Sequence, residues 1–182
     1  MGVARLFVAV GLLGLASIAA ARADDQPLPL LRSMALLPDE PNYVDLAVGG
    51  YALYGHHYDN QDVGGSAEIR LGQKWEYLGP ALGVVGNVDG GIFVYAGAYT
   101  DIQWGPVVIT PLFGVGADRH GDSHDEYLGG VFEFRLQVAA TYQFADASRL
   151  GLQIGHISSA HINRVNPGET EAMLYYGIPF RL

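Results

Sequence analysis

The chain has 182 residues, enough for one folded domain, with a formal net charge of -9 at pH 7 and 16% charged residues. Such a charge argues against nucleic acid as a partner, because binding a polyanion needs clustered Lys and Arg, and the absence of cysteine excludes disulfides and thiol chemistry. The 25 glycines and 11 tyrosines favour close-packed strands, because glycine costs about 1 kcal/mol relative to alanine inside a helix.

The first 23 residues have the pattern of a secretory signal peptide. Met1–Arg5 is a short basic start, Leu6–Ala20 is an apolar run, and Ala21-Arg22-Ala23 fits the small-x-small cleavage rule. We predict cleavage after Ala23. An N-terminal membrane anchor is the alternative, but a spanning helix needs about 20 apolar residues and this run is shorter.

Residues 24–42 are expected to form an irregular leader. They hold four of the nine prolines and show no alternation of apolar and polar residues. Within them, Leu30–Leu37 could form one or two helical turns, to which we assign no function.

From Tyr43 onward the sequence alternates between apolar and small or polar residues, which predicts strands. Ordinary strands run about five or six residues, whereas a tilted membrane-spanning strand takes about 9 to 11, and these segments are of the longer kind. An even number of long strands predicts an all-β fold, an eight-stranded antiparallel transmembrane up-and-down β-barrel over residues 43–182. The predicted strands are Tyr43–Tyr54, Val63–Trp75, Pro80–Val88, Ile92–Trp104, Val107–Ala117, Gly130–Phe144, Leu150–Ser158 and Thr170–Leu182.

The predicted connections alternate between long and short, as in outer-membrane barrels. The soluble lipocalin-type barrel, which shares the strand number, is the alternative. The long polar loops are His56–Asp62, Asp118–Gly129 and Ser159–Glu169, and the short links are Glu76–Gly79, Gly105–Pro106, Ala145–Ser148 and the external hairpin Asp89–Gly91. Aromatic residues expected at the two membrane interfaces are Tyr43, Tyr54, Trp75, Tyr77, Trp104, Tyr127, Phe144, Tyr175 and Phe180.

His156 and Ser158 are the candidate reactive residues. Residues i and i+2 of a strand lie on the same face about 6.6 Å apart, and here that face is the apolar one that should meet lipid. A serine beside a histidine is the arrangement used for acyl transfer, in which the histidine takes the hydroxyl proton and a carboxylate orients the ring. The residues alone leave open whether the pair is reactive or merely ends a strand at the polar interface.

Three segments resemble the outer-membrane lipid A 3-O-deacylases of the PagL type. They are His156-Ile157-Ser158-Ser159-Ala160, Asn166-Pro167-Gly168 and Leu174–Phe180, with a weaker similarity over residues 43–182 that includes Phe132–Arg135. The resemblance implies an eight-stranded outer-membrane barrel that hydrolyses the ester-linked acyl chain at the 3-position of lipid A. It also implies that Ser158 is the nucleophile and His156 the general base.

Two positions depart from the family pattern. Ser159 stands where the family has an asparagine, and Thr170 stands where it has the acidic partner of the histidine. In a regular strand Thr170 faces outward with His156, whereas Glu169 and Glu171 face the other way. A bulge at the loop boundary could turn Glu169 outward. The predicted catalytic set is therefore His156, Ser158 and Glu169.

The expected protein is a serine esterase of the cell outer membrane that needs no metal or cofactor. Its expected partners are lipid A or lipopolysaccharide as substrate and the surrounding outer-membrane lipid, with a homodimer left open and no nucleic acid. The alternative function is a non-catalytic barrel with a structural or lipopolysaccharide-binding role. Two other groups of charged residues are not expected to form functional sites. The loop around His120 and His124 is expected to be a solvated acidic loop rather than a cation site. Glu133 and Arg135 are expected to fill the barrel interior.

Overall fold

The computed structural model describes residues 33–53, 62–122, 124–125 and 127–181. The predicted signal peptide and most of the first long loop lie outside these residues. The chain divides into two units, Met1–Ser33 and Met34–Leu182, and the description below concerns the second. In the part of the chain that the structure describes, no helix is long and apolar enough to cross a membrane.

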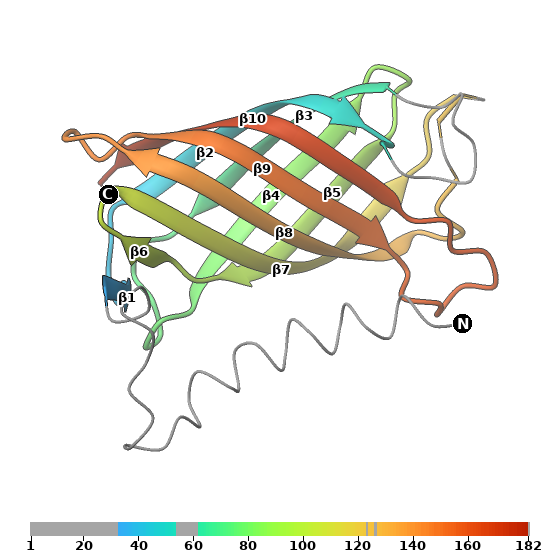
Figure 1. The fold of residues 1–182 in the computed structure, drawn as a ribbon. Helices are drawn as coiled ribbons and strands as arrows, with labels where there is room; N and C mark the ends of the chain where they lie inside the picture. The colour runs from blue at the N-terminus through green and yellow to red at the C-terminus, as the bar shows by residue number, and fades with distance from the viewer. Residues whose placement is uncertain (1–32, 54–61, 123, 126, 182) are drawn as a thin grey trace. The chain divides into compact units, whose positions relative to one another are not determined.

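The second unit is a closed antiparallel β-barrel (Figure 1). Eight strands each pair with two neighbours, and the pairings of β2 with β10 and of β7 with β8 close the ring. The predicted fold class is thus confirmed. The strands are β1 (Met34–Leu36), β2 (Asn42–Tyr51), β3 (Asp62–Arg70), β4 (Gly79–Asn87), β5 (Ile92–Tyr99), β6 (Ile102–Trp104), β7 (Val107–Arg119), β8 (Phe132–Gln143), β9 (Arg149–Ser158) and β10 (Glu169–Phe180).

The fourth predicted strand is interrupted. β5 ends at Tyr99 and β6 begins at Ile102, with Thr100 and Asp101 both buried between them. Two successive buried residues break the alternation of a strand, as in a bulge. The cause is Asp101, whose carboxylate accepts hydrogen bonds from Arg149 (3.0 Å) and Lys74 (2.9 Å).

The last residues of the expected leader belong to the sheet. β1 pairs with β6, and beyond it the Leu37 N–H donates to the Asp101 carbonyl at 3.0 Å. Residues 34–36 are therefore a strand rather than irregular chain or a helical turn. The reason is that the edge of β6 offers their backbone hydrogen-bond partners, which a local sequence pattern does not reveal.

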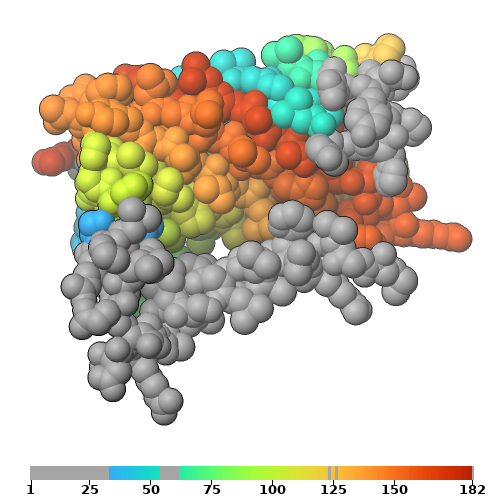
Figure 2. Space-filling view, in the orientation of Figure 1, coloured from blue at the N-terminus to red at the C-terminus, as the bar shows by residue number. Residues whose placement is uncertain are grey.

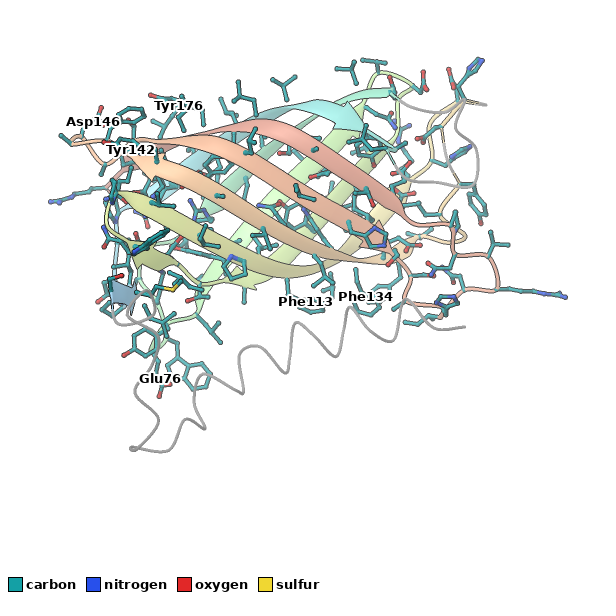
Figure 3. The ribbon with its side chains drawn as sticks, in the orientation of Figure 1. Glu76, Phe113, Phe134, Tyr142, Asp146 and Tyr176 are labelled. Carbon is teal, nitrogen blue, oxygen red and sulfur yellow. The ribbon has the colours of Figure 1, made fainter. Side chains whose placement is uncertain are left out.

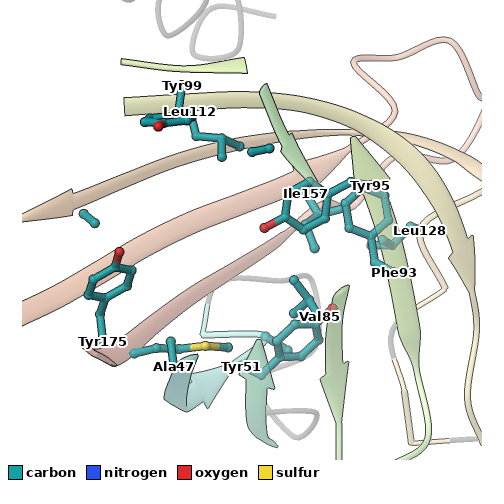
Figure 4. Close-up of a cluster of buried hydrophobic side chains, with 14 residues drawn as sticks. Ala47, Tyr51, Val85, Phe93, Tyr95, Tyr99, Leu112, Leu128, Ile157 and Tyr175 are labelled. Carbon is teal, nitrogen blue, oxygen red and sulfur yellow. The ribbon is translucent and has the colours of Figure 1, made fainter. Parts of the chain in front are cut away.

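The barrel is apolar outside and polar inside, the reverse of a water-soluble protein. Arg135 and Glu133, predicted to face inward, are both fully buried. Arg135 pairs with Glu171 rather than Glu133, and Glu133 receives a hydrogen bond from Asn163 at 3.4 Å. A smaller apolar cluster shares the interior (Figure 4). The exposed apolar residues of the strands include Leu46, Val48, Val63, Ile69, Leu82, Val84, Ile92, Val94, Phe113, Val115, Phe132, Leu136, Val138, Leu150, Leu152, Ile154, Leu174 and Ile178.

The two ends of the barrel differ. The tight turn between β8 and β9 lies at one end and the loop 159–168 between β9 and β10 at the other (Figure 1). Tyr43 and Tyr175, expected among the interfacial aromatics, are instead buried inside, where the Arg149 guanidinium lies 4.4 Å from the Tyr43 ring centroid. Exposed aromatic residues toward the short-turn end are Trp75, Tyr77, Trp104, Tyr142, Phe144 and Tyr176, some of them labelled in Figure 3.

Candidate active site

His156 and Ser158 lie on the outer wall of the barrel, as predicted from alternation. His156 is exposed and Ser158 half-buried, at the end of β9 that leads into the loop 159–168. His156 stands between Leu136 of β8 and Thr170 of β10, and Ser158 stands opposite Phe134. The structure therefore brings the two predicted residues onto one membrane-facing strand end.

The polar groups at the His156 ring are the Thr170 hydroxyl and the backbone of Glu169, rather than a carboxylate. The distance from His156 Nδ1 to Thr170 Oγ1 is 3.0 Å. β10 runs regularly from its first residue, so the bulge expected at Glu169 is absent. Glu169 is 3% exposed and points into the barrel, where its carboxylate meets Tyr51. The geometry thus contradicts the expected partnership of Glu169 with His156, because a regular ladder sends alternate residues to opposite faces.

Gly168 supports the other edge of the His156 ring. It has a φ of +70°, and a Cβ built there would lie 2.9 Å from His156 Cε1 and 3.0 Å from Nε2. Gly168 directly precedes Glu169, which pairs with Ile157, so it lies at the strand end that carries Ser158. The His156 ring thus has Thr170 at Nδ1 and Gly168 beside Cε1 and Nε2.

The residues that follow Ser158 form a tight turn held by Asn166. Ile162 N–H donates to the Ser159 carbonyl at 3.0 Å, and Ala160 and His161 have φ of 51° and 66°. Both signs are those of a type I′ turn, which is unfavourable for residues other than Gly, Asn and Asp. Asn166 Oδ1 accepts hydrogen bonds from the Ser159 N–H and hydroxyl, both at 2.8 Å. Ser159 itself is fully buried, so its hydroxyl is engaged inside the loop.

The histidine and the serine are neighbours that do not yet bond. Among the residues that the structure describes, no hydrogen bond joins His156 to Ser158. Catalytic hydrogen bonds are often long in proteins without substrate and tighten in the complex. The missing hydrogen bond is thus compatible with a base and nucleophile pair in a protein without substrate.

An aromatic cluster borders Ser158 on the outer wall. Phe134, directly across from Ser158, stacks on Phe113 at 6.0 Å between ring centroids and meets Phe132 edge-on at 5.2 Å. Phe113 and Phe134 are labelled in Figure 3, and the wall formed by β8, β9 and β10 is visible in orange and red in Figure 2. A polar pair beside an apolar surface suits a substrate that carries both an ester and a hydrocarbon chain.

The acidic loop offers no comparable site. His120 lies 3.4 Å from Asp125 and His124 lies 3.3 Å from Asp122, each as a separate pair. Within the described residues, no group of three or more potential ligands converges as a metal would require.

Comparison with known protein families identifies the family of this barrel. The family model described as lipid A 3-O-deacylase (PagL) matches residues 47–179, from β2 to the penultimate residue of β10. The chain belongs to this family. It is therefore an outer-membrane β-barrel protein whose family substrate is lipid A.

Solved structures agree with this fold. The crystal structure of the outer membrane enzyme PagL is 20% identical, with a TM-score of 0.61 over 76% of this chain and 99% of that chain. A de novo designed transmembrane β-barrel (12% identity, TM-score 0.47, 78% and 99% covered) and the Yersinia pestis outer membrane protein Ail (13%, 0.47, 78% and 100%) are more distant. No curated protein matches the chain significantly.

Membership fixes the orientation of the site. Outer-membrane barrels have short periplasmic turns and longer extracellular loops, so the end that carries the loop 159–168 is the extracellular one. His156 and Ser158 consequently lie at the level of the outer leaflet. Sequence reasoning predicted both, but it assigned no role to Asn166 and Gly168, whose only signal was the Asn-Pro-Gly motif.

Proposed function

We propose that this protein is a serine esterase that removes the ester-linked acyl chain from the 3-position of lipid A, with Ser158 as nucleophile and His156 as general base. The observation that carries the proposal is the placement of these two side chains on the outward face of β9 at the extracellular end. In a member of the lipid A 3-O-deacylase family, that is the level at which outer-leaflet acyl esters lie.

The proposed reaction follows the course of ester hydrolysis by a serine enzyme. His156 Nε2 takes the Ser158 proton as Oγ attacks the ester carbonyl. The tetrahedral intermediate then expels the sugar oxygen, which receives that proton from His156. Water, deprotonated by His156, next attacks the Ser158 ester. The second tetrahedral intermediate releases the fatty acid, and His156 returns the proton to Ser158 Oγ. Metal ions or cofactors have no part in these steps.

The surroundings of Ser158 support a lipid substrate. The cluster of Phe113, Phe132 and Phe134 offers an aromatic surface for a hydrocarbon chain directly beside the nucleophile. The amide of Asn166, fixed beside the turn that follows Ser158, is a candidate donor to the oxyanion, since Ser159 is occupied. Preorganised donors of this kind commonly contribute a factor of about 10² to 10³ in rate.

The non-catalytic barrel remains the second candidate, favoured by one observation. His156 faces a neutral hydroxyl, and loss of the acid of a triad costs about 10⁴ in rate. We therefore expect the esterase activity of this protein to be slow. Export by a signal peptide cleaved after Ala23, an irregular leader over the part of residues 24–42 that precedes β1, and a homodimer stay predictions.

The experiment is release of 3-hydroxy fatty acid from lipopolysaccharide by the purified, folded barrel, followed by mass spectrometry. We expect slow release by the unmodified protein and none by Ser158→Ala or His156→Ala. Ser148→Ala, which changes a serine at the periplasmic turn, and His124→Ala, in the acidic loop, are the matched controls and should retain the full rate. Equal rates for the unmodified protein and Ser158→Ala would reject the esterase and leave the lipopolysaccharide-binding barrel.

A further inference from the structure

We propose that Thr170 is the positioning residue of His156: its hydroxyl accepts a hydrogen bond from Nδ1–H and so keeps Nε2 unprotonated on the side of Ser158. This inference rests on the proposed function and concerns how this chain operates its site with a neutral partner. The structural basis is the 3.0 Å contact between Nδ1 and Oγ1 across the β9–β10 ladder.

The contact is set by strand register rather than by a flexible loop. Thr170 and His156 are directly paired residues, and both side chains point to the outer face. Directly paired residues of an antiparallel ladder bring their Cβ atoms to about 4.5–5.5 Å, close enough for a threonine hydroxyl to reach an imidazole. Threonine is also stiff at χ1, so its hydroxyl holds one direction at small entropic cost.

Gly168 completes the positioning. Its backbone lies against Cε1 and Nε2, where any side chain would come within about 3 Å of the ring. The imidazole thus lies between the Thr170 hydroxyl at Nδ1 and Gly168 near Nε2, with the Glu169 backbone as a further hydrogen-bond partner of the ring. Only the tautomer with the proton on Nδ1 leaves Nε2 free to take the Ser158 proton.

A carboxylate at position 170 would orient the His156 ring more strongly than the threonine hydroxyl does. It accepts the Nδ1–H bond and also stabilises the imidazolium that forms when Ser158 gives up its proton, whereas a hydroxyl offers no charge. Thr170→Glu should therefore raise the rate of fatty-acid release by a factor of about 10 or more, since charge-assisted hydrogen bonds are roughly twice as strong as neutral ones. Thr170→Val, which keeps the shape and removes the hydroxyl, should lower it about 10-fold.

The deciding measurement is the tautomer of His156, observed by nitrogen NMR of histidine-labelled protein in detergent micelles at pH 8. His156→Gln identifies the signal. We expect protonation at Nδ1 in the unmodified protein and in Thr170→Ser, and a mixture of tautomers in Thr170→Val. A proton on Nε2 in the unmodified protein, or a tautomer unaffected by Thr170→Val, would overturn the inference.

A second pair of variants tests the contact with Gly168. Gly168→Ala should displace the ring and lower the rate of release. Gly105→Ala is the matched control, because Gly105 also has a positive φ, of 57°, but nothing within 4 Å of a built Cβ. Equal rates of fatty-acid release by Gly168→Ala and Gly105→Ala would show that Gly168 does not position the His156 ring. A tautomer that follows Thr170 while no variant releases fatty acid upholds the role of Thr170 and rejects the esterase.

Discussion

Asn166 is the residue on which the conformation of the loop after Ser158 depends. Its Oδ1 accepts two hydrogen bonds from Ser159, and its Nδ2 lies 3.3 Å from His161 Nδ1. The turn that it closes places Ala160 and His161 in left-handed conformations, which cost of order 1 kcal/mol or more each and persist only where surrounding contacts impose them.

We predict that Asn166→Ala lowers fatty-acid release at least 10-fold while the barrel still folds. Each lost hydrogen bond to Ser159 is worth about 1 kcal/mol, and the turn behind the nucleophile relaxes without them. Asn163→Ala is the control in the same loop, since Asn163 contacts Glu133 and not Ser159. Release is measured by mass spectrometry, and folding by the band shift on electrophoresis without heating. A rate as high as that of Asn163→Ala would contradict the prediction.

For single residues, the sequence predicts which face of the barrel a side chain points to better than it predicts which residue that side chain contacts. Strict alternation along β9 and β10 placed His156, Ser158 and Thr170 on the outer face without any structure. Choosing Glu169 as the partner of His156 was wrong in geometry, because it assumed a bulge that the ladder does not contain. The roles of Gly168 and Asn166 arise from the path of a loop, for which local patterns carry little information.

Among the elements, the segment before β2 is unusual because it enters the barrel end. Glu40 N–H donates to the Gly72 carbonyl at 3.1 Å, and its carboxylate pairs with Lys74 at 2.8 Å and with Arg149. Burial raises the pKa of Glu40 to about 7, with further help from a hydrogen bond to Asp101 and its charge. That shared hydrogen bond and the positive charges of Arg70, Arg149 and Lys74 hold the pKa of Asp101 well below its ordinary value.

These directions predict a barrel that becomes more stable when the pH falls from 8 to 5. Glu40 has a higher pKa folded than unfolded, so folding takes up a proton, and the stabilisation present below pH 4.5 is lost as the pH rises through about 7. The effect should be on the order of 2–3 kcal/mol. Urea unfolding in detergent at several pH values measures it, and Glu40→Gln should flatten the dependence. Glu76→Gln, on the exposed periplasmic hairpin, should not, and an unchanged slope in Glu40→Gln would refute the assignment.

The elements themselves were largely predictable. Alternation over long segments gave all eight barrel strands, and Pro80–Val88 differs from β4 by a single residue at each end. The failures, β1 and the break after Tyr99, share a cause in Asp101 and the edge of β6. Lys74 and Arg149, which draw Asp101 inward, are distant in sequence, so no local window contains the reason for the break.

For the whole molecule, the barrel interior combines an ion-pair network with an apolar cluster. Arg70 donates to Asp45 and, at 2.7 Å, to Tyr175, while Arg135 donates to Glu171 and lies 5.0 Å from the Tyr95 ring centroid. Buried ion pairs add little net stability, yet removing one partner is costly because the other charge is left without compensation. The network thus makes the packing of β2, β3, β5, β8 and β10 interdependent.

We predict that Arg135→Met destabilises the folded barrel by about 3–5 kcal/mol, since it leaves Glu171 unpaired inside. The double variant Arg135→Met with Glu171→Leu should recover most of that loss. Urea unfolding of barrels in lipid vesicles, followed by tryptophan fluorescence, gives the four free energies of the cycle. Arg164→Met, in an exposed loop, is the control for loss of an arginine. Additive effects of the two substitutions would show that the charges do not interact.

The position of His156 and Ser158 on the outer wall determines how a substrate meets them. A lipid that shares the leaflet with the barrel arrives sideways, by lateral diffusion, and never passes through water. The rate of encounter then depends on the mole fraction of that lipid in the leaflet. Other lipids lower this rate because they occupy area beside the barrel wall. For the proposed esterase, the composition and fluidity of the membrane thereby become part of the rate law.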